Sequence, residues 1–224
     1  MKILLLETAT DICSVVLSEN GKVVAQRESD DRNAHSTNLP LFVKDLLVPG
    51  LDAVCVSSGP GSYTGLRIGV STAKGICYAL GIPLLSVPTL LSMASFYYQR
   101  HPEYRGLVCP MIDARRMECY TMIVGPDCNV LRETQADVVT AELYASWLGQ
   151  SEMMFIGNGA EKTRPILQSH SHALYDSTFT ISAEGLLAMA ERRLAEGKVE
   201  NVAYFEPFYL KDFVAKKSVV HGLR

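Results

Sequence analysis

Residues 59–75, GPGSYTGLRIGVSTAKG, hold five glycines, a density typical of loops that bind phosphate groups. Their spacing fits none of the familiar motifs. After Gly59 and Gly61 the next glycine is Gly65, one position too late for the G-x-G-x-x-G dinucleotide fingerprint. The sequence lacks the Gly-Lys-Ser/Thr of a P-loop, and Ser62 lacks the flanking glycines of a nucleophile elbow. An anion held by free N–H groups where the following helix begins is one remaining alternative.

Two carboxylates end equivalent apolar strands, Glu7 after KILLL and Asp113 after LVCPMI. If they faced each other across a cleft between two lobes, they would suggest a metal–nucleotide site. The residues after Glu7 lack the glycine that normally lets a β-hairpin wrap closely around a phosphate. A second candidate loop at the edge of a nucleotide is GNG at 157–159. The predicted nucleotide-binding residues are therefore Glu7, Thr8, Thr10, Asp113, Gly157, Asn158 and Gly159.

The five histidines form no catalytic or metal-binding pattern. HExxH and HxxxH are both absent, so we predict neither catalytic residues nor a metal site. His170 and His172 lie two positions apart in a polar stretch, and we expect them at the surface. His35, just before Ser36, is either the neighbour of a helix cap or part of an interface.

Composition indicates a globular protein of a reducing compartment. The 224 residues are 48% hydrophobic, and a net charge of −3 gives no basic surplus with which the chain would grip nucleic acid by itself. Six cysteines without a CxxC pair predict buried free thiols. The stretch MKILLLETAT is too short for a signal peptide, and no run reaches the ~20 apolar residues of a membrane span. We expect a cytoplasmic protein without membrane contact.

Hydrophobic periodicity predicts two similar halves, each with the order β-β-β-α-β-α. In the first half we expect strands at 2–7, 13–18, 22–28, 52–58 and 82–88 and helices at 38–47, 65–80 and 89–99. In the second half we expect strands at 107–114, 118–125, 129–137 and 152–157 and helices at 140–149, 158–168 and 182–196. The duplication predicts two α/β lobes, residues 1–104 and 105–224.

Turn and cap residues place several of these boundaries. Residues 19–21 (ENG) predict a hairpin turn, and Gly81 predicts the end of the helix at 65–80. For the helix at 38–47, Ser36, Thr37 and Asn38 are cap candidates, which would place Pro40 in the tolerant first turn.

The helix at 65–80 has a second face of small and apolar residues that a helix outside a single sheet does not need. Gly69 and Gly75 each cost about 0.5–1 kcal/mol relative to alanine inside a helix. Close approach of another helix would offset this cost, either from the same lobe or from a partner subunit. On this basis Gly69→Leu is expected to leave the monomer folded and to abolish association. An unfolded variant would instead mean that the small face is internal.

The residues SSGPGSYTGLRIGVSTAKG closely resemble the signature of the bacterial TsaB family, also called YeaZ. The resemblance extends to the first strand with its acidic end, to HSTNLP, to IGNGAEK and to FEPFYLKDF. This sequence has Glu7 where the family usually has aspartate and Tyr63 where it has phenylalanine, and the segment LLVPGLDAV is shorter than the family pattern.

The resemblance implies a two-lobed actin/sugar-kinase/heat-shock ATPase-like fold. It also implies a non-catalytic subunit that binds and activates TsaD, the transferase that makes threonylcarbamoyladenosine next to the tRNA anticodon. Family members form homodimers, and a TsaE-type ATPase joins the assembly. This chain would need no cofactor of its own, ATP or ADP would lie at the complex interface, and tRNA would be reached only through the complex. The expected partner or dimer interface comprises His35, Leu39, Phe42, Tyr63, Thr64, Gly65, Arg67, Ile68, Gly69, Thr72 and Ile76.

Two rival functions come from other classes. The first is an enzyme, namely an active metal- or nucleotide-dependent transferase or peptidase of the same superfamily. The missing metal ligands argue against this function. The second is a small-molecule kinase with a phosphate hairpin after Glu7, and the missing glycine argues against that.

Overall fold

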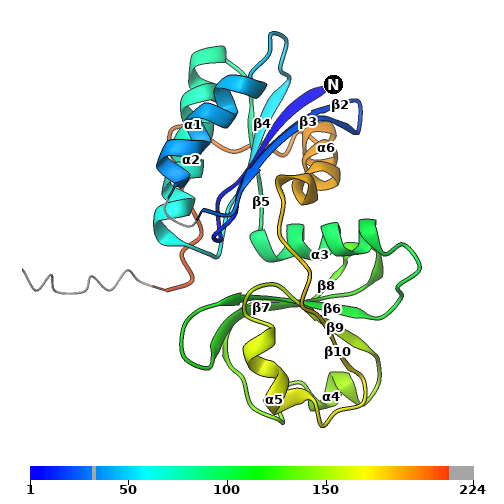
Figure 1. Ribbon diagram of the computed structural model, residues 1–224. Coiled ribbons are helices and arrows are strands. Elements are labelled where there is room, and N and C mark those ends of the chain that lie inside the picture. The colour runs from blue at the N-terminus through cyan, green and yellow to red at the C-terminus, as the bar shows by residue number, and fades with distance from the viewer. Residues whose placement is uncertain (32–33, 212–224) are drawn as a thin grey trace, which may run out of the picture.

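The computed structural model describes residues 1–31 and 34–211, so Asp212 and Phe213 of FEPFYLKDF and His221 lie outside the described residues. The chain forms two lobes, each built on a mixed five-stranded sheet (Figure 1). The strand order is β3-β2-β1-β4-β5 in the first sheet and β8-β7-β6-β9-β10 in the second, so the two sheets share one topology. The predicted two-lobed ATPase-like α/β fold is confirmed.

The first sheet combines an antiparallel meander of three strands with two further strands that pair in parallel. Its strands are β1 (Lys2–Glu7), β2 (Cys13–Glu19), β3 (Lys22–Ser29), β4 (Ala53–Ser57) and β5 (Leu84–Val87). β1 pairs antiparallel with β2 and parallel with β4. The predicted turn between β2 and β3 is confirmed, because Asn20 and Gly21 both have the positive φ that a tight hairpin requires.

Helices cover both faces of the first sheet (Figure 1). The elements are α1 (His35–Leu46) and α2 (Tyr63–Leu80) on one face, and the 3-10 turn η3 (Ala183–Leu186) with α6 (Leu187–Ala195) on the other. Successive side chains of β1 alternate between these faces, so Leu4 packs towards α1 and α2 while Leu5 packs towards η3 and α6. Because both faces are covered, β1 reads as a continuous apolar run.

The second sheet is built in the same way. Its strands are β6 (Leu107–Asp113), β7 (Glu118–Val124), β8 (Val130–Val138), β9 (Met153–Ile156) and β10 (Ala173–Asp176). Its other elements are α3 (Thr89–Arg100), α4 (Ala145–Leu148), α5 (Arg164–Leu167) and the 3-10 turns η1 (Pro126–Cys128) and η2 (Glu161–Thr163). α3 covers one face, while α4 and α5 cover the other.

Two helices each pack on the sheet formed by the other half of the chain. The strands of the first sheet all lie before residue 104 and those of the second all lie after it. However, α3 lies in the first part of the chain and packs on the second sheet, and α6 lies in the second part and packs on the first. Each helix buries its apolar side chains against the sheet of the other half of the chain, and α3 contacts η3 where they meet. The two halves are therefore interlocked rather than joined by one linker.

Several local predictions were wrong. α1 begins at His35 with Ala34 as its N-cap, so the residues at 36–38 are helical and make no side-chain cap bond, and Pro40 lies in the second turn. The helices expected at 140–149 and 158–168 are reduced to α4 and to the short pair η2 and α5. β10 was not predicted, because only four residues pair with β9 and a polar stretch precedes them.

The first part of the helix expected at 140–149 is not formed, and Tyr144, just before α4, joins a buried polar network instead. Tyr144 is fully buried, and its hydroxyl donates to Asp137 Oδ2 at 2.8 Å. The same carboxylate accepts two bonds from Arg132, both at 2.7 Å, and one from Thr121 Oγ1 at 2.5 Å. Tyr144 is buried against the sheet because the buried Asp137 carboxylate requires hydrogen-bond donors.

Tyr144→Phe is expected to lower the free energy of unfolding by about 1.5 kcal/mol, because it removes one bond to a carboxylate that keeps Arg132 and Thr121. Urea denaturation measures the difference. Tyr204→Phe is the matched control, since its side chain is 83% exposed. Equal stability of Tyr144→Phe and the wild type would show that the Tyr144 bond contributes nothing net.

Candidate functional site

The glycine-rich segment joins β4 to α2 and packs against the loop after β1. Ser62 N donates to Ala9 O at 2.6 Å. A Cβ atom at Gly61 would overlap the Ala9 carbonyl, and one at Gly65 would overlap the carbonyl oxygen of Thr8. The glycines therefore serve close backbone approach within one chain.

Gly69 and Gly75 differ although both lie inside α2. A Cβ at Gly69 would overlap Thr8 Oγ1, whereas no atom lies within 4 Å of a Cβ built at Gly75. The structure therefore contradicts the premise that Gly69 faces a partner, and a leucine at this position would overlap Thr8 within the same lobe. The element that approaches Gly69 is a loop of the same lobe and not another helix.

The last described residues, 200–211, form a C-terminal strap that runs along α2 towards the second lobe. Lys74 Nζ on α2 donates to the carbonyls of Ala203 and Phe205 at 3.2 and 2.9 Å. Phe208 N donates to Ser58 O at 2.7 Å, next to the glycine-rich segment.

The end of the strap reaches the second lobe. The Tyr209 ring lies 4.7 Å from that of Tyr63, centroid to centroid, and Lys211 forms an ion pair with Glu118. The strap thus adds a third connection between the lobes, besides α3 and the segment that leads into η3.

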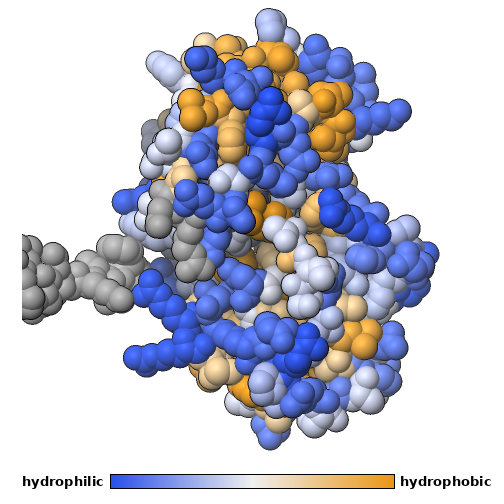
Figure 2. Space-filling view, in the orientation of Figure 1, coloured by the Kyte–Doolittle hydropathy of each residue, from blue (hydrophilic) through white to orange (hydrophobic). Residues whose placement is uncertain are grey.

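Two neighbouring cavities occupy the cleft between the lobes. The larger has a volume of about 660 Å³ and the smaller about 360 Å³, and both are lined by Thr10, Asp11 and Asn158. Figure 2 shows the junction between the lobes, where hydrophobic side chains are visible in a hollow rimmed by hydrophilic ones. A cleft between the lobes, which we considered from the sequence only as a condition for a nucleotide site, is therefore present.

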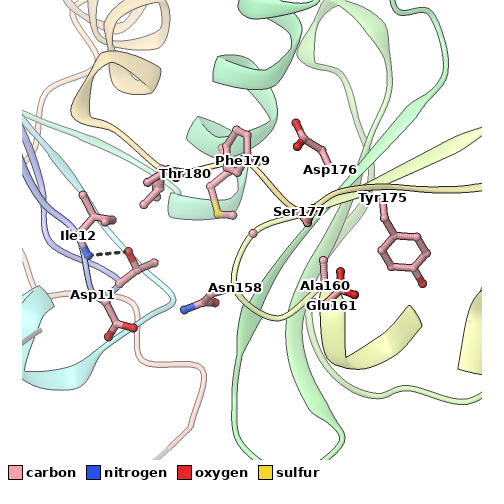
Figure 3. Close-up of a pocket in the computed structure, with 14 residues that line it drawn as sticks. Asp11, Ile12, Asn158, Ala160, Glu161, Tyr175, Asp176, Ser177, Phe179 and Thr180 are labelled. Atoms are coloured by element: carbon pink, nitrogen blue, oxygen red, sulfur yellow. Dashed lines mark hydrogen bonds between the residues drawn. The ribbon is translucent and has the colours of Figure 1, made fainter. Parts of the chain in front are cut away.

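Figure 3 shows the smaller cavity, in which Asn158 extends from the second lobe towards Asp11 of the first. Its apolar wall includes Ile12 and Phe179. Two further carboxylates line this cavity: Glu161 is bound by Arg164 through two bonds of 2.9 Å, and Asp176 accepts two bonds from Thr178.

Glu7 does not line either cavity. Its side chain is fully buried, and Oε1 accepts bonds from Ala9 N at 2.7 Å and Ser57 Oγ at 2.8 Å. Burial raises the pKa of this carboxyl to about 7, although these bonds oppose the shift. Thr8 is also fully buried. Glu7 and Thr8 are therefore shielded from both cavities, and this burial does not support the predicted contact of these two residues with a nucleotide.

Asp113 lies at the larger cavity, where its partner is Lys162 and not Glu7. Burial opposes ionisation of Asp113, but the bond from Lys162 outweighs it, together with one from Arg115 N at 2.8 Å, and holds its pKa below the ordinary value. Lys162 Nζ also donates to the carbonyls of Arg116 and Glu118 at 2.8 and 2.7 Å. Lys162 thereby fixes the turn between β6 and β7. This role was not predicted from the sequence, although Lys162 is the last residue of IGNGAEK.

The loop at 157–159 packs against β6. A Cβ at Gly157 would overlap the Met93 side chain, and one at Gly159 would lie 3.0 Å from Asp113 N. Asn158 Oδ1 accepts a bond from Asp113 N at 3.0 Å. Packing therefore accounts for both glycines, and of the predicted nucleotide-binding residues Thr10, Asp113, Gly157 and Asn158 line the cavities.

The predicted partner residues fall into three groups. His35 is 7% exposed and bonded to Ile12 O, and it is buried together with Leu39, Gly65 and Gly69, so these residues offer no surface to a partner. The residues at the larger cavity are Tyr63 and Thr64, with Arg67 over the Tyr63 ring at 4.4 Å. The third group, Phe42, Ile68, Thr72 and Ile76, is half-buried on α1 and α2, and its three apolar members also touch the first core.

Other sequence features have structural explanations. All six cysteines are free, and burial raises the pKa of the Cys13 and Cys77 thiols to about 11. His170 and His172 are only partly exposed and bond the carbonyls of Ala141 and Leu148. Within residues 1–31 and 34–211, no three or more His, Cys, Asp or Glu side chains group as metal ligands. None of the described helices combines the length and apolarity needed to cross a membrane.

Comparison with known proteins gives consistent matches. A sequence model of the family described as "TsaD: tRNA N6-adenosine threonylcarbamoyltransferase" matches residues 29–219. The chain is 32% identical over 231 residues to the tRNA threonylcarbamoyladenosine biosynthesis protein TsaB of Escherichia coli K12, covering 98% of each chain. It is 32% identical to TsaB of Bacillus subtilis over 173 residues, covering 75% of this chain and 69% of that one. The solved structure of YeaZ from Pseudomonas aeruginosa is similar with a TM-score of 0.79 and 26% identity, covering 93% of this chain and 99% of that one.

Proposed function

Because the chain belongs to the TsaB family of tRNA threonylcarbamoyladenosine biosynthesis proteins, we propose that it is a scaffold subunit that binds and activates a TsaD-type transferase. In this role the chain holds the transferase in its active form and does not carry out the chemistry itself. The position of Glu7 supports the second point, since its carboxyl is buried within the first lobe and does not meet Asp113 in the cleft.

The observation that carries the proposal is the outer side of α1 and α2. These helices bury their other side in the first core, yet Leu41 remains 55% exposed and half-buried Phe42, Ile68 and Ile76 lie on the same pair of helices. We propose that this surface, which we call the α1–α2 face, contacts the transferase. Exposed apolar side chains with small residues between them suit a helix-to-helix contact.

Gly75→Arg is expected to abolish binding to the TsaD-type subunit without unfolding the chain. Space at Gly75 is open, so an arginine side chain fits the monomer but adds bulk and charge to the α1–α2 face. Replacing a helical glycine also favours the helix by roughly 0.5–1 kcal/mol. Co-purification and size exclusion with light scattering would measure the complex, and urea denaturation would measure the fold.

The control is Ala195→Arg, which places the same side chain at an exposed position of α6, the helix on the opposite face of the first sheet. Normal complex formation by Ala195→Arg and none by Gly75→Arg is the expected result. A stable complex with Gly75→Arg would rule out the α1–α2 face as the contact.

The proposal includes further partners and a place in the cell. Without the transferase, two copies pair through the α1–α2 face, and a TsaE-type ATPase joins the assembly. The chain needs no cofactor of its own, and ATP or ADP lies at the complex interface. The assembly works in the cytoplasm.

A further inference from the structure

At the edge of the larger cavity, the Tyr63 ring contacts both Arg67 and Tyr209, and we call these three side chains the stack. The guanidinium of Arg67 lies 4.4 Å from the centroid of the Tyr63 ring, and the Tyr63 and Tyr209 rings lie 4.7 Å apart with an angle of 36° between their planes. Tyr63 and Tyr209 both line the cavity. Because Tyr209 comes from the C-terminal strap and Tyr63 from α2, the stack joins segments that are far apart in the sequence.

Positive charge lies on the opposite side of this cavity. Arg115 lines it from the turn between β6 and β7, and the neighbouring Arg116 is exposed on the same turn. Both arginines have a left-handed backbone, with φ of 72° and 51°, and Lys162 holds the turn through the Arg116 carbonyl. The turn therefore presents two adjacent guanidinium groups from a fixed backbone.

The local charge balance is positive although the chain carries −3 overall. Asp113 is compensated by Lys162, and Glu118 is compensated by Lys211. The remaining charged side chains at the stack and the turn are Arg67, Arg115 and Arg116, with Asp11 as a further carboxylate of the cavity lining. This local surplus is not visible in the overall composition.

We propose that Tyr63, Tyr209 and these three arginines form a contact site for single-stranded RNA, the anticodon loop of the tRNA on which the complex acts. An unstacked base lies against the Tyr209 ring, and the phosphates on either side of it lie against the arginines. Aromatic rings beside cations are the usual means of holding single-stranded RNA, because every base has a face that stacks. This inference rests on the proposed function, and it adds a direct RNA contact by this chain to the expectation that tRNA is reached only through the complex.

The geometry favours RNA over a free nucleoside triphosphate. The loop after β1, which would wrap the phosphates, is closed against the glycine-rich segment, and its Ala9 N–H is bonded to Glu7. The arginines come from α2 and from the β6–β7 turn, on opposite sides of the cavity, and this spread suits successive phosphates along a strand.

The test is fluorescence anisotropy of the full chain with a labelled anticodon stem–loop RNA at several salt concentrations. Tyr209→Ala is expected to weaken binding about 10-fold with an unchanged salt slope. Arg115→Gln combined with Arg116→Gln is expected to weaken binding and to lower the salt slope by about 0.7 for each arginine. Tyr204→Ala, an exposed tyrosine on the same strap that does not line the cavity, is the control and is expected to bind as the wild type does.

Several outcomes would overturn the inference. These are no binding by the wild type, equal binding of a duplex of the same length, full competition by ATP, and wild-type affinity of Tyr209→Ala. Circular dichroism of each variant would show that its fold is retained. Co-purification with the transferase separates the two proposals: a chain that forms the complex but binds no stem–loop contradicts the RNA site alone, and the reverse contradicts the scaffold role alone.

Discussion

Gly65→Ala is expected to lower the free energy of unfolding by about 3 kcal/mol, whereas Gly75→Ala is expected to raise it by about 0.5–1 kcal/mol. Both positions lie in α2 and have ordinary helical backbone, so helix propensity favours alanine equally at each. A methyl group at Gly65 would overlap the Thr8 carbonyl oxygen, and backbone cannot rotate away as a flexible side chain can. Space at Gly75 is open, so only the gain in helix propensity remains there.

Urea denaturation of the two variants and the wild type would measure these opposite changes, with the midpoint shifting and the slope unchanged. The pair is a matched comparison, since the same substitution is made twice in one helix. If Gly65→Ala were as stable as the wild type, the loop after β1 would have to move away from α2 at little cost. The close packing that we assign to the glycine-rich segment would then be wrong.

The fold was largely predictable because its patterns are local. β1 and β4 are continuous apolar runs, and Asn20-Gly21 is a strong signal for a hairpin turn. The common order of elements in the two halves predicted the shared sheet topology. In contrast, the exchange of α3 and α6 between the lobes was not predictable, because an apolar helix face carries no information on which sheet it covers.

The partner of the glycines was missed for the same reason. Small residues at 65 and 69 indicate close approach, but periodicity does not say whether a helix, a loop or another chain approaches. Thr8, which fills that space, gave no signal beyond its place after a strand. Its closeness depends on β1 pairing with β4 and on α2 packing over both, which are tertiary contacts.

The expectation that Glu7 and Asp113 face each other was wrong, because the equivalence of two strands fixes only the position of a residue in each sheet. Glu7 and Asp113 do end equivalent strands, yet Glu7 points into the first lobe and Asp113 lies at the cleft. Tyr209 and Arg115 line the larger cavity, and Lys162 binds Asp113 at its edge. These three residues come from separate segments, and only the fold brings them together. The motifs IGNGAEK and FEPFYLKDF contain two of them, but nothing in a motif states what its members contact.

Glu7→Gln is expected to stabilise the protein by about 3 kcal/mol at pH 8 and to have little effect near pH 4. Burial raises the pKa of Glu7 from 4.5 to about 7, so the folded state binds the proton more tightly than the unfolded state does. The contribution of Glu7 to stability is therefore most favourable below pH 4.5, falls as the pH rises from 4.5 to 7, and stays low above it. Glutamine remains neutral, and its Oε1 can still accept the bonds from Ala9 N and Ser57 Oγ.

Urea denaturation of wild type and variant at several pH values between 4 and 8 would isolate this effect, because every other titrating group is common to both. Glu133→Gln on exposed β8 is the control and is expected to follow the wild type at each pH. Equal pH dependence of Glu7→Gln and the wild type would mean that Glu7 is ionised in the folded protein. An ionised, fully buried Glu7 would require a cationic partner at Oε2, which has no bonding partner among the described residues. A neutral Glu7 instead accounts for a buried carboxyl whose described partners are uncharged backbone amides and a hydroxyl.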